Sequence, residues 1–302
     1  MTFDAFADFR MDGHVAIVTG GAQNIGEAIS RTFAGAGASV MIADRNADKA
    51  VETAARLSTE TGGEVLGMGC DVTEEADIAR VVEHTVATFG GISTLVNNVG
   101  WGKPYKDPLD IPMEDMVDGY KLNCVAALRM TAACRPYLLE ADNATVTNSG
   151  SMVAVMPAFE FLAYSAAKAA LNHAMLSVAH YFGKKVRVNS ILIGTVLTDA
   201  YADVGLDEKI RHALANPKNL TGRAGTPQDV ANAFLWLASP AAGWVSGQTI
   251  QVAGGGARSR ILPKSSGELD RDIAGVADNA VGPELVHRGG VFVVVGQRRQ
   301  AE

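Results

Sequence analysis

The stretch His14-Val-Ala-Ile-Val-Thr-Gly-Gly-Ala-Gln-Asn-Ile-Gly26 decides the fold of this chain. It opens with a short run rich in apolar and β-branched residues, which is typical of a buried strand. A glycine-rich turn follows and leads into a helical pattern near residues 25–36. Because such a turn lets backbone N–H groups approach a pyrophosphate closely, the stretch predicts a nucleotide-binding site.

The alternation of strand and helix continues along the chain. We expect further strands at 39–43, 64–69, 94–97, 144–147, 186–191 and 249–252, separated by helical stretches near 46–60, 74–89, 113–139, 198–216 and 227–238 and by a helix that carries Tyr164 and Lys168. Strands separated by helix-length segments indicate βαβ units with right-handed crossovers. The predicted fold class is therefore α/β, a single doubly wound parallel sheet (a Rossmann fold) with helices on both faces.

This pattern stops at Gly254-Gly-Gly256. We therefore expect a Rossmann-fold domain over residues 1–256 and a C-terminal extension over residues 257–302. Within the extension, Glu284–His287 and Val291–Val295 flank Arg288-Gly-Gly290, which predicts a hairpin with a three-residue turn. The extension is either loosely attached or an arm at a subunit contact, because an exposed Val-Phe-Val-Val-Val edge needs cover.

Composition narrows the classes of function. The formal charge of −7 over 302 residues argues against a nucleic-acid surface. No apolar run approaches the roughly 18 residues that cross a membrane, and the N-terminus lacks the pattern of a signal peptide. Cys70, Cys124 and Cys134 have neither metal-ligand spacing nor the makings of a disulfide framework. We expect a cytoplasmic protein with reduced thiols and no metal site.

Carboxylates follow two of the predicted strands. Asp44 ends the second strand, where it can bond the adenosine ribose hydroxyls and repel a 2′-phosphate, so NAD is favoured over NADP. The neighbouring Arg45 could instead receive a 2′-phosphate, which keeps NADP open as the less favoured cofactor. Asp71, before Val72 at the end of the third strand, either meets the adenine or caps the next helix.

Tyr164 and Lys168 form a candidate proton-transfer pair. They stand four residues apart, so on a helix they share one face. A lysine ammonium beside a phenol stabilises the phenolate, which lowers the pKa of the phenol from its usual value of about 10. Such a pair is a general acid/base device. Taken separately, Tyr164 and Lys168 could each have only a structural role. Ser151, thirteen positions before the tyrosine, could likewise be an ordinary turn serine.

Taken together, these motifs resemble the short-chain dehydrogenase/reductase superfamily over about residues 10–257. The resemblance implies that Tyr164 is the catalytic acid/base, that Lys168 assists it and holds the nicotinamide ribose, that Ser151 bonds the substrate oxygen, and that Asn123 supports a water relay. The cofactor-binding residues that the resemblance implies are Gly20, Gln23, Asn24, Ile25, Gly26, Asp44, Arg45, Asp71, Val72, Asn98, Gly100, Tyr164, Lys168, Gly194, Val196 and Thr198.

Four positions depart from the family pattern. Asn24 replaces the middle glycine of the cofactor turn, and asparagine tolerates a left-handed backbone better than most residues. Val99 replaces an alanine, Ile193 a proline after the sixth strand, and Ala253 an aspartate that is frequent before the final glycines. None of these changes removes a proton-transfer group.

Other stretches, among them Asp110–Met116 and Ser239–Gln248, resemble bacterial hydroxysteroid dehydrogenases of the 7α type. We expect the substrate pocket to include Trp101, Met152, Phe159 and Phe161, unless these residues pack on each other. An apolar pocket with a methionine suits a bulky alicyclic or aromatic alcohol.

The chain is therefore expected to be an oxidoreductase that transfers a hydride between NAD(H) and a secondary alcohol or ketone, with an apolar alicyclic, steroid-like or aryl substrate. The alternative enzyme is an NADPH-dependent ketone or 3-oxoacyl carrier reductase. A different class, a non-catalytic nucleotide sensor, is disfavoured by the intact catalytic set. The resemblance also implies a homo-oligomer, either a tetramer or a dimer.

Overall fold

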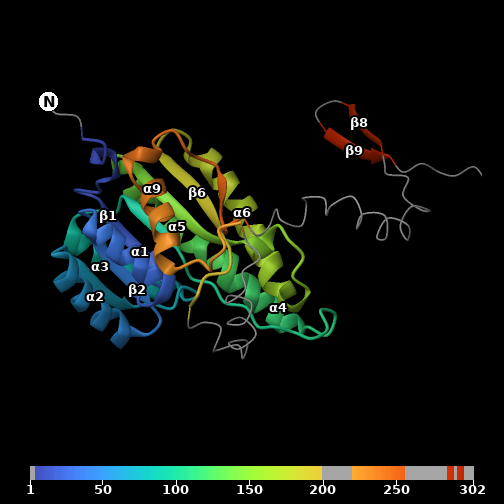
Figure 1. Ribbon diagram of the computed structural model, residues 1–302, viewed down its shortest axis with the longest axis horizontal. Helices are drawn as coiled ribbons and strands as arrows, with labels where there is room; N and C mark the ends of the chain where they lie inside the picture. Colours follow the sequence, from blue (N-terminus) through green and yellow to red (C-terminus); the bar gives the residue numbers. More distant parts are fainter. Residues whose placement is uncertain (1–3, 199–219, 256–283, 289–290, 296–302) are drawn as a thin grey trace, which may run out of the picture. The chain divides into compact units, whose positions relative to one another are not determined.

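The computed structural model describes residues 4–198, 220–255, 284–288 and 291–295. A seven-stranded parallel sheet forms the centre of its main unit (Figure 1). Its strand order is β3-β2-β1-β4-β5-β6-β7, and all neighbouring strands are parallel. The strands are β1 (Val15–Thr19), β2 (Ser39–Asp44), β3 (Val65–Gly69), β4 (Thr94–Asn97), β5 (Ala144–Ser151), β6 (Val186–Ile193) and β7 (Thr249–Val252). This sheet confirms the predicted fold class.

The strand order reverses between β1 and β4. In open α/β sheets, ligands bind at such a switch point, beyond the carboxyl ends of the strands. The glycine-rich turn follows β1 directly, so the fold places it at the position where a nucleotide is expected.

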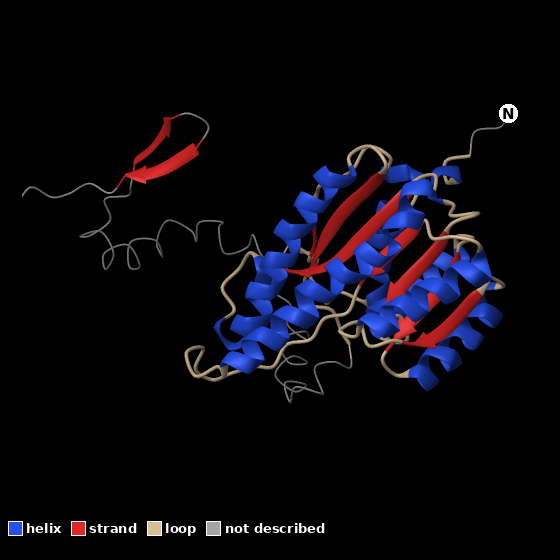
Figure 2. Ribbon diagram, turned by 180° about the vertical axis from the view of Figure 1, so that it is seen from behind, coloured by secondary structure: helices blue, strands red, loops and turns tan. Residues whose placement is uncertain are grey.

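Helices cover both faces of this sheet, as Figure 2 shows from behind. Side chains alternate along β1: Val18 packs with Phe33 and Phe234 on one face, and Ile17 packs with Met130 on the other. Because both faces are buried, the strands read as nearly continuous apolar runs. The first face carries α1 (Asn24–Gly35), α2 (Ala47–Thr61) and α9 (Pro227–Ala238), and the second carries α3 (Glu75–Phe89), α5 (Ala126–Glu140) and α6 (Leu162–Phe182).

The helix expected over 113–139 is divided in three. It comprises α4 (Met113–Tyr120), a π-helical turn η2 (Lys121–Val125) and α5. The residues that flank η2 keep helical dihedrals, with Tyr120 at φ −68° and Ala126 at φ −57°. Helical propensity does not distinguish a π turn from an α turn, so this feature could not be predicted from the residues. π turns often mark functional sites.

Short 3₁₀ turns complete the described part of the main unit: η1 (Ala7–Phe9), η3 (Met152–Ala154), η4 (Phe159–Phe161) and η5 (Pro240–Ala242). β5 and β6 run further than expected, because the polar residues up to Ser151 continue the ladder and pair with β6 up to Ile193. The helical stretch expected near 198–216 lies, beyond Thr198, outside the described residues.

Contacts divide the chain into two units, residues 1–259 and 260–302. In the second unit, β8 (Glu284–Arg288) pairs with β9 (Val291–Val295) in an antiparallel hairpin, which confirms the hairpin prediction. The expected three-residue turn was wrong, because Arg288 extends β8 and pairs with Val291, so two residues connect the strands.

Two further observations concern the described residues. The three cysteines are buried and unpaired, in accord with their wide spacing. No helix in this part of the chain has the length and apolarity to cross a bilayer.

Candidate active site

The turn between β1 and α1 is closed by contacts between its own backbone segments. A Cβ on Gly26 would lie 1.9 Å from the Gly20 carbonyl oxygen, so only glycine fits there. Gly20 has φ 61° and Asn24 has φ 53°, both in the left-handed region. The structure thus confirms that asparagine holds the left-handed position in this turn. α1 begins at Asn24, which points the start of the helix, with Ile25 and Gly26, toward the switch point.

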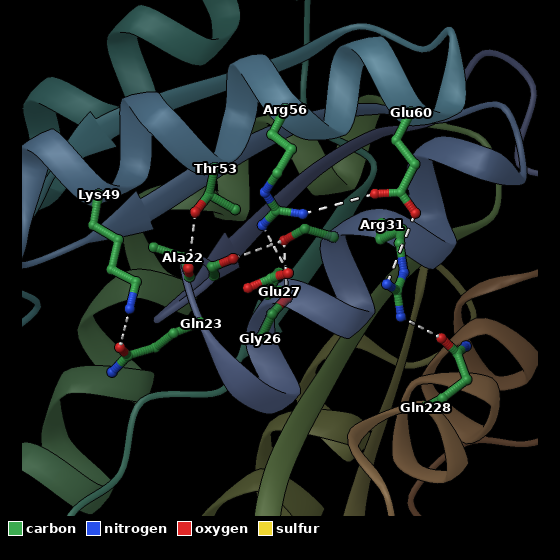
Figure 3. Close-up of polar contacts among 12 residues, drawn as sticks. Ala22, Gln23, Gly26, Glu27, Arg31, Lys49, Thr53, Arg56, Glu60 and Gln228 are labelled. Carbon is green, nitrogen blue, oxygen red and sulfur yellow. Dashed lines mark hydrogen bonds and ion pairs between the residues drawn. The ribbon is translucent and has the colours of Figure 1, made fainter. Parts of the chain in front are cut away.

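Residues of α2 hold this turn from outside. The Thr53 hydroxyl donates to the Ala22 carbonyl at 3.0 Å, and the Lys49 ammonium donates to Gln23 Oε1 at 2.9 Å. Both contacts are drawn as dashed lines in Figure 3. The Gln23 side chain is therefore engaged with a lysine of the neighbouring helix. Sequence reasoning placed Gln23 in the site and missed Lys49, which has no motif of its own.

Asp44 lies beneath the same turn. Its Oδ2 accepts from the Ala22 N–H at 3.2 Å, and its Oδ1 accepts from the Asn46 N–H at 3.1 Å. Asp44 is half-buried, and the adjacent Arg45 is exposed. The carboxylate is thus fixed at the end of β2, next to the turn, as the sequence predicted.

Asp71 follows β3 and makes a local turn. Its Oδ1 accepts from both the N–H and the hydroxyl of Thr73, at 2.9 and 2.7 Å. The suggestion that Asp71 caps the next helix is wrong, because the N-cap of α3 is Glu74. Val72 is buried beside Asp71, so the loop after β3 is held by both packing and hydrogen bonds.

Asn98 forms hydrogen bonds with the glycine-rich turn after β1 and with β5. Its N–H donates to Thr19 Oγ1 at 3.0 Å, and its Nδ2 donates to the carbonyls of Thr19 and Gly20 at 3.2 Å each. Its Oδ1 accepts from the Ser149 hydroxyl at 2.9 Å. Asn98 therefore links the glycine-rich turn to β5 through hydrogen bonds.

Lys168 is the buried charge of the site. Its side chain is 1% exposed, and its Nζ donates to the carbonyls of Ser149 at 2.8 Å and Val99 at 3.3 Å. Burial lowers the pKa of Lys168 to about 8. The Nζ lies 5.8 Å from the centroid of the half-buried Tyr164 ring. The structure thus places both members of the predicted pair at the carboxyl ends of β4 and β5.

Asn123 stands in the π turn, also buried. Its Oδ1 accepts from the Trp101 N–H at 3.1 Å, and its Nδ2 donates to the carbonyls of Trp101 and Gly119 at 2.9 Å each. A Cβ on Gly100 would lie 2.7 Å from Lys168 Nζ and 3.1 Å from Asn123 Oδ1. Gly100 is therefore the point at which the loop after β4, the lysine and the asparagine meet.

Ser151 ends β5 and is half-buried, with its Oγ accepting from the Val153 N–H at 3.4 Å. α6, which carries Tyr164 and Lys168, packs against β5 and η3. The structure therefore brings the elements that carry all four predicted catalytic residues to one end of the sheet.

The loop after β6 forms another wall. Gly194 donates its N–H to the Val252 carbonyl at 3.0 Å, and a Cβ there would lie 2.6 Å from Ala253 Cα. Val196 is buried and forms an isolated bridge with Gly225. Thr198 is half-buried. Ile193, in place of the family's proline, ends β6, pairs with Ser151 of β5 and Val252 of β7, and packs on the core.

The predicted substrate-pocket residues divide by exposure. Met152 is buried and Phe161 is half-buried, whereas Trp101 is 49% exposed and Phe159 is 63% exposed. They come from the loop after β4, from η3 and from η4. Their shared lining of one pocket remains a prediction, because most of the expected lid at 198–216 lies outside the described residues.

Two contributions were missed by sequence reasoning. Ser149 holds Lys168 through its carbonyl and Asn98 through its hydroxyl, and a backbone carbonyl leaves no signal in residue identity. Cys124 is buried next to Asn123, where burial raises the pKa of the thiol and the charge of Lys168 opposes that rise. The position of Cys124 directly after Asn123 was the one feature of the sequence that could have indicated its place near the site.

Comparisons with known proteins agree with this arrangement. Residues 20–256 match a family model described as enoyl-(acyl carrier protein) reductase. The chain is 37% identical over 250 residues to the 7α-hydroxysteroid dehydrogenase of Escherichia coli K12, which covers 82% of this chain and 96% of the relative.

Two solved structures are similar over most of their length. One is a 7α-hydroxysteroid dehydrogenase complexed with NADH and 7-oxo glycochenodeoxycholic acid, with TM-score 0.78, 36% identity, and coverage of 84% of this chain and 98% of that one. The other is the L-sorbose reductase of Gluconobacter frateurii complexed with NADPH and L-sorbose, with TM-score 0.78, 28% identity, and coverage of 83% and 99%.

The close approach at Gly100 makes a first prediction. In Gly100→Ala the new methyl group displaces the end of Lys168 from its carbonyl partners. We expect the free energy of unfolding to fall by about 1–3 kcal/mol and kcat for alcohol oxidation to fall about 10- to 100-fold. Gly91→Ala is the control, because a Cβ at Gly91 meets no atom within 4 Å. Steady-state kinetics and thermal unfolding measure the two effects, and wild-type kcat in Gly100→Ala contradicts the assignment.

Proposed function

The chain belongs to the short-chain dehydrogenase/reductase family, and we propose that it transfers a hydride between NAD(H) and an apolar alicyclic, steroid-like or aryl secondary alcohol or ketone. The family assignment makes it an oxidoreductase acting on CH–OH groups. The observation that carries the proposal is the buried Lys168 ammonium beside Tyr164, at the end of the sheet where the nucleotide turn lies.

The residues present fit a nicotinamide dinucleotide. The turn from Gly20 to Gly26 has the close backbone approach and the helix start that suit a pyrophosphate. Asp44 would bond the ribose hydroxyls, and the loop at Asp71 and Val72 would border the adenine. Gly194, Val196 and Thr198 would border the nicotinamide. When bound, the cofactor supplies the hydride acceptor or donor.

Tyr164 is assigned the proton transfer. In oxidation, its phenolate accepts the proton of the substrate hydroxyl, and in reduction its phenol donates a proton to the carbonyl oxygen. Lys168 stabilises the phenolate through its positive charge, which the low-dielectric surroundings screen weakly. Ser151 donates a hydrogen bond to the substrate oxygen. Asn123 holds the loop at Trp101 in place and supports a relay of protons toward solvent.

The substrate class is inferred from the apolar residues Trp101, Met152, Phe159 and Phe161 and from the hydroxysteroid relatives. The similar protein of Escherichia coli K12 is a 7α-hydroxysteroid dehydrogenase. The similar solved structure of such an enzyme is complexed with 7-oxo glycochenodeoxycholic acid. The alternative is an NADPH-dependent ketone or 3-oxoacyl carrier reductase. Exposed Arg45 beside Asp44 and the NADPH-bound L-sorbose reductase give it some support.

We further propose that the protein is a cytoplasmic homo-oligomer, a tetramer or a dimer. Support comes from apolar side chains left exposed on described surfaces, such as Leu176 and Tyr181 of α6 and Trp244 before β7. Sedimentation velocity on the full chain decides the point, since a monomer at micromolar concentration excludes a stable oligomer.

The catalytic assignment predicts the effect of Tyr164→Phe. Loss of the hydroxyl removes the proton acceptor, so kcat falls on the order of 10²- to 10⁴-fold while NADH binding persists. Tyr137→Phe on α5 is the control, since α5 carries none of the proposed catalytic residues. NADH formation is followed with each alcohol that the wild type oxidises. Unchanged turnover in Tyr164→Phe would remove the tyrosine from the mechanism.

The cofactor assignment predicts a change of preference in Asp44→Asn. Removal of the negative charge weakens the repulsion of a 2′-phosphate, so the ratio of the Kd for NADPH to the Kd for NADH falls about tenfold. Asp48→Asn, an exposed carboxylate in the first turn of α2, is the control. Fluorescence titration measures both constants, and tight NADPH with weak NADH in the wild type would favour the alternative reductase.

A further inference from the structure

The loop after β4, residues 100–105, lies against the proposed catalytic tyrosine; we call it the strap. A Cβ on Gly102 would lie 2.7 Å from Tyr164 Cβ and 2.9 Å from its Cγ, so the strap backbone touches the base of the tyrosine side chain. The first end of the strap is fixed at Trp101, whose N–H and carbonyl both bond the Asn123 side chain.

The second end of the strap is fixed by a different set of groups. The Tyr105 hydroxyl donates to Asp115 Oδ2, and Lys103 Nζ donates to the same oxygen at 3.1 Å. Lys103 Nζ also lies 5.2 Å from the centroid of the Tyr105 ring. The Tyr105 N–H donates to the Glu160 carbonyl of η4 at 2.7 Å. Three groups of the strap thus converge on Asp115 and η4.

Asp115 belongs to α4, whose position is set independently of the strap. A Cβ on Gly119 of α4 would lie 3.4 Å from Ala163 Cβ, so α4 packs directly on the helix that carries Tyr164. Asp115 therefore ties the strap to a helix already anchored beside the tyrosine. The Asp115 side chain is 35% exposed, and hydrogen bonds to a partly shielded carboxylate are stronger than those between neutral groups.

The fastening also connects the proposed walls of the substrate pocket. Trp101 stands at one end of the strap, and η4, with Phe159 and Phe161, accepts the hydrogen bond of Tyr105 at the other. A strap held at both ends fixes the separation of these aromatic side chains. A loosened strap has to be ordered again whenever a large substrate binds, and this raises the KM.

We propose that Asp115 is a positioning residue that, through Tyr105 and Lys103, fastens the strap against Tyr164 and sets the opening for bulky substrates. The expected change in KM rests on the proposed function. The expected loosening of the strap rests on the hydrogen bonds alone. The two are tested separately.

The structural arm uses hydrogen–deuterium exchange of the full chain, which needs no substrate. In Asp115→Ala, the amides of the strap, including those of Trp101 and Tyr105, exchange about tenfold faster than in the wild type. Asp115→Asn keeps an oxygen that accepts from Tyr105 and recovers part of the protection. Asp118→Ala, also on α4, removes an exposed ion pair with Lys121 of η2 and leaves the strap unchanged. Wild-type exchange in Asp115→Ala overturns the proposal.

The kinetic arm uses 7-oxo glycochenodeoxycholic acid as the bulky probe and cyclohexanone as the small one. Asp115→Ala raises the KM for the bulky probe about tenfold, changes the KM for the small probe less, and keeps kcat within about threefold. The Kd for NADH is unchanged. Tyr105→Phe reproduces the effect in part, and Asp118→Ala does not.

The outcomes separate the two claims. Equal KM changes for both probes, or kinetics in Asp115→Ala that match those of Asp118→Ala, overturn the role in substrate selection. If the wild type turns over no ketone or alcohol with either cofactor, the proposed function fails, and the exchange result alone then decides whether Asp115 fastens the strap.

Discussion

The site depends on a single buried cation. The Lys168 ammonium is almost fully removed from water, and an unpaired charge in such a place is strongly destabilising. It is satisfied by the carbonyls of Val99 and Ser149, at the ends of β4 and β5. The need to satisfy this charge also constrains the residues around the ammonium. Gly100 leaves room for the ammonium, and the Ser149 hydroxyl turns away from it to bond Asn98.

The same cation links the glycine-rich turn to the tyrosine that we propose transfers the proton. Asn98 bonds the carbonyls of Thr19 and Gly20 on one side and Ser149 on the other, so the nucleotide turn and the lysine cradle share one hydrogen-bonded network. Lys168 sits four residues after Tyr164 on α6, which fixes the ring near the charge. The proposed placement of the nucleotide and the proposed role of the phenol therefore depend on a common set of contacts at the switch point of the sheet.

Much of this arrangement could be predicted from the sequence, because it rests on local patterns. Strands buried on both faces give continuous apolar runs, and the glycine turn and the four-residue spacing of Tyr164 and Lys168 have direct physical meanings. The left-handed backbone at Asn24 followed from asparagine chemistry. The π turn at Asn123, the carbonyl partners of Lys168 and the contacts of Lys49 and Asp115 did not, because they depend on the backbone path and on partners distant in sequence. The turn of the C-terminal hairpin was overestimated by one residue for the same reason.

We propose that the buried Lys168 charge enables hydride transfer between NAD(H) and an alcohol. The decisive measurement is NADH formation by the wild type and by Lys168→Met, over a panel of secondary alcohols that includes a 7α-hydroxysteroid and cyclohexanol. We expect the wild type to reduce NAD⁺ with at least one alicyclic alcohol, and we expect Lys168→Met, although folded, to lose nearly all of this activity. A folded Lys168→Met with the wild-type rate would contradict it.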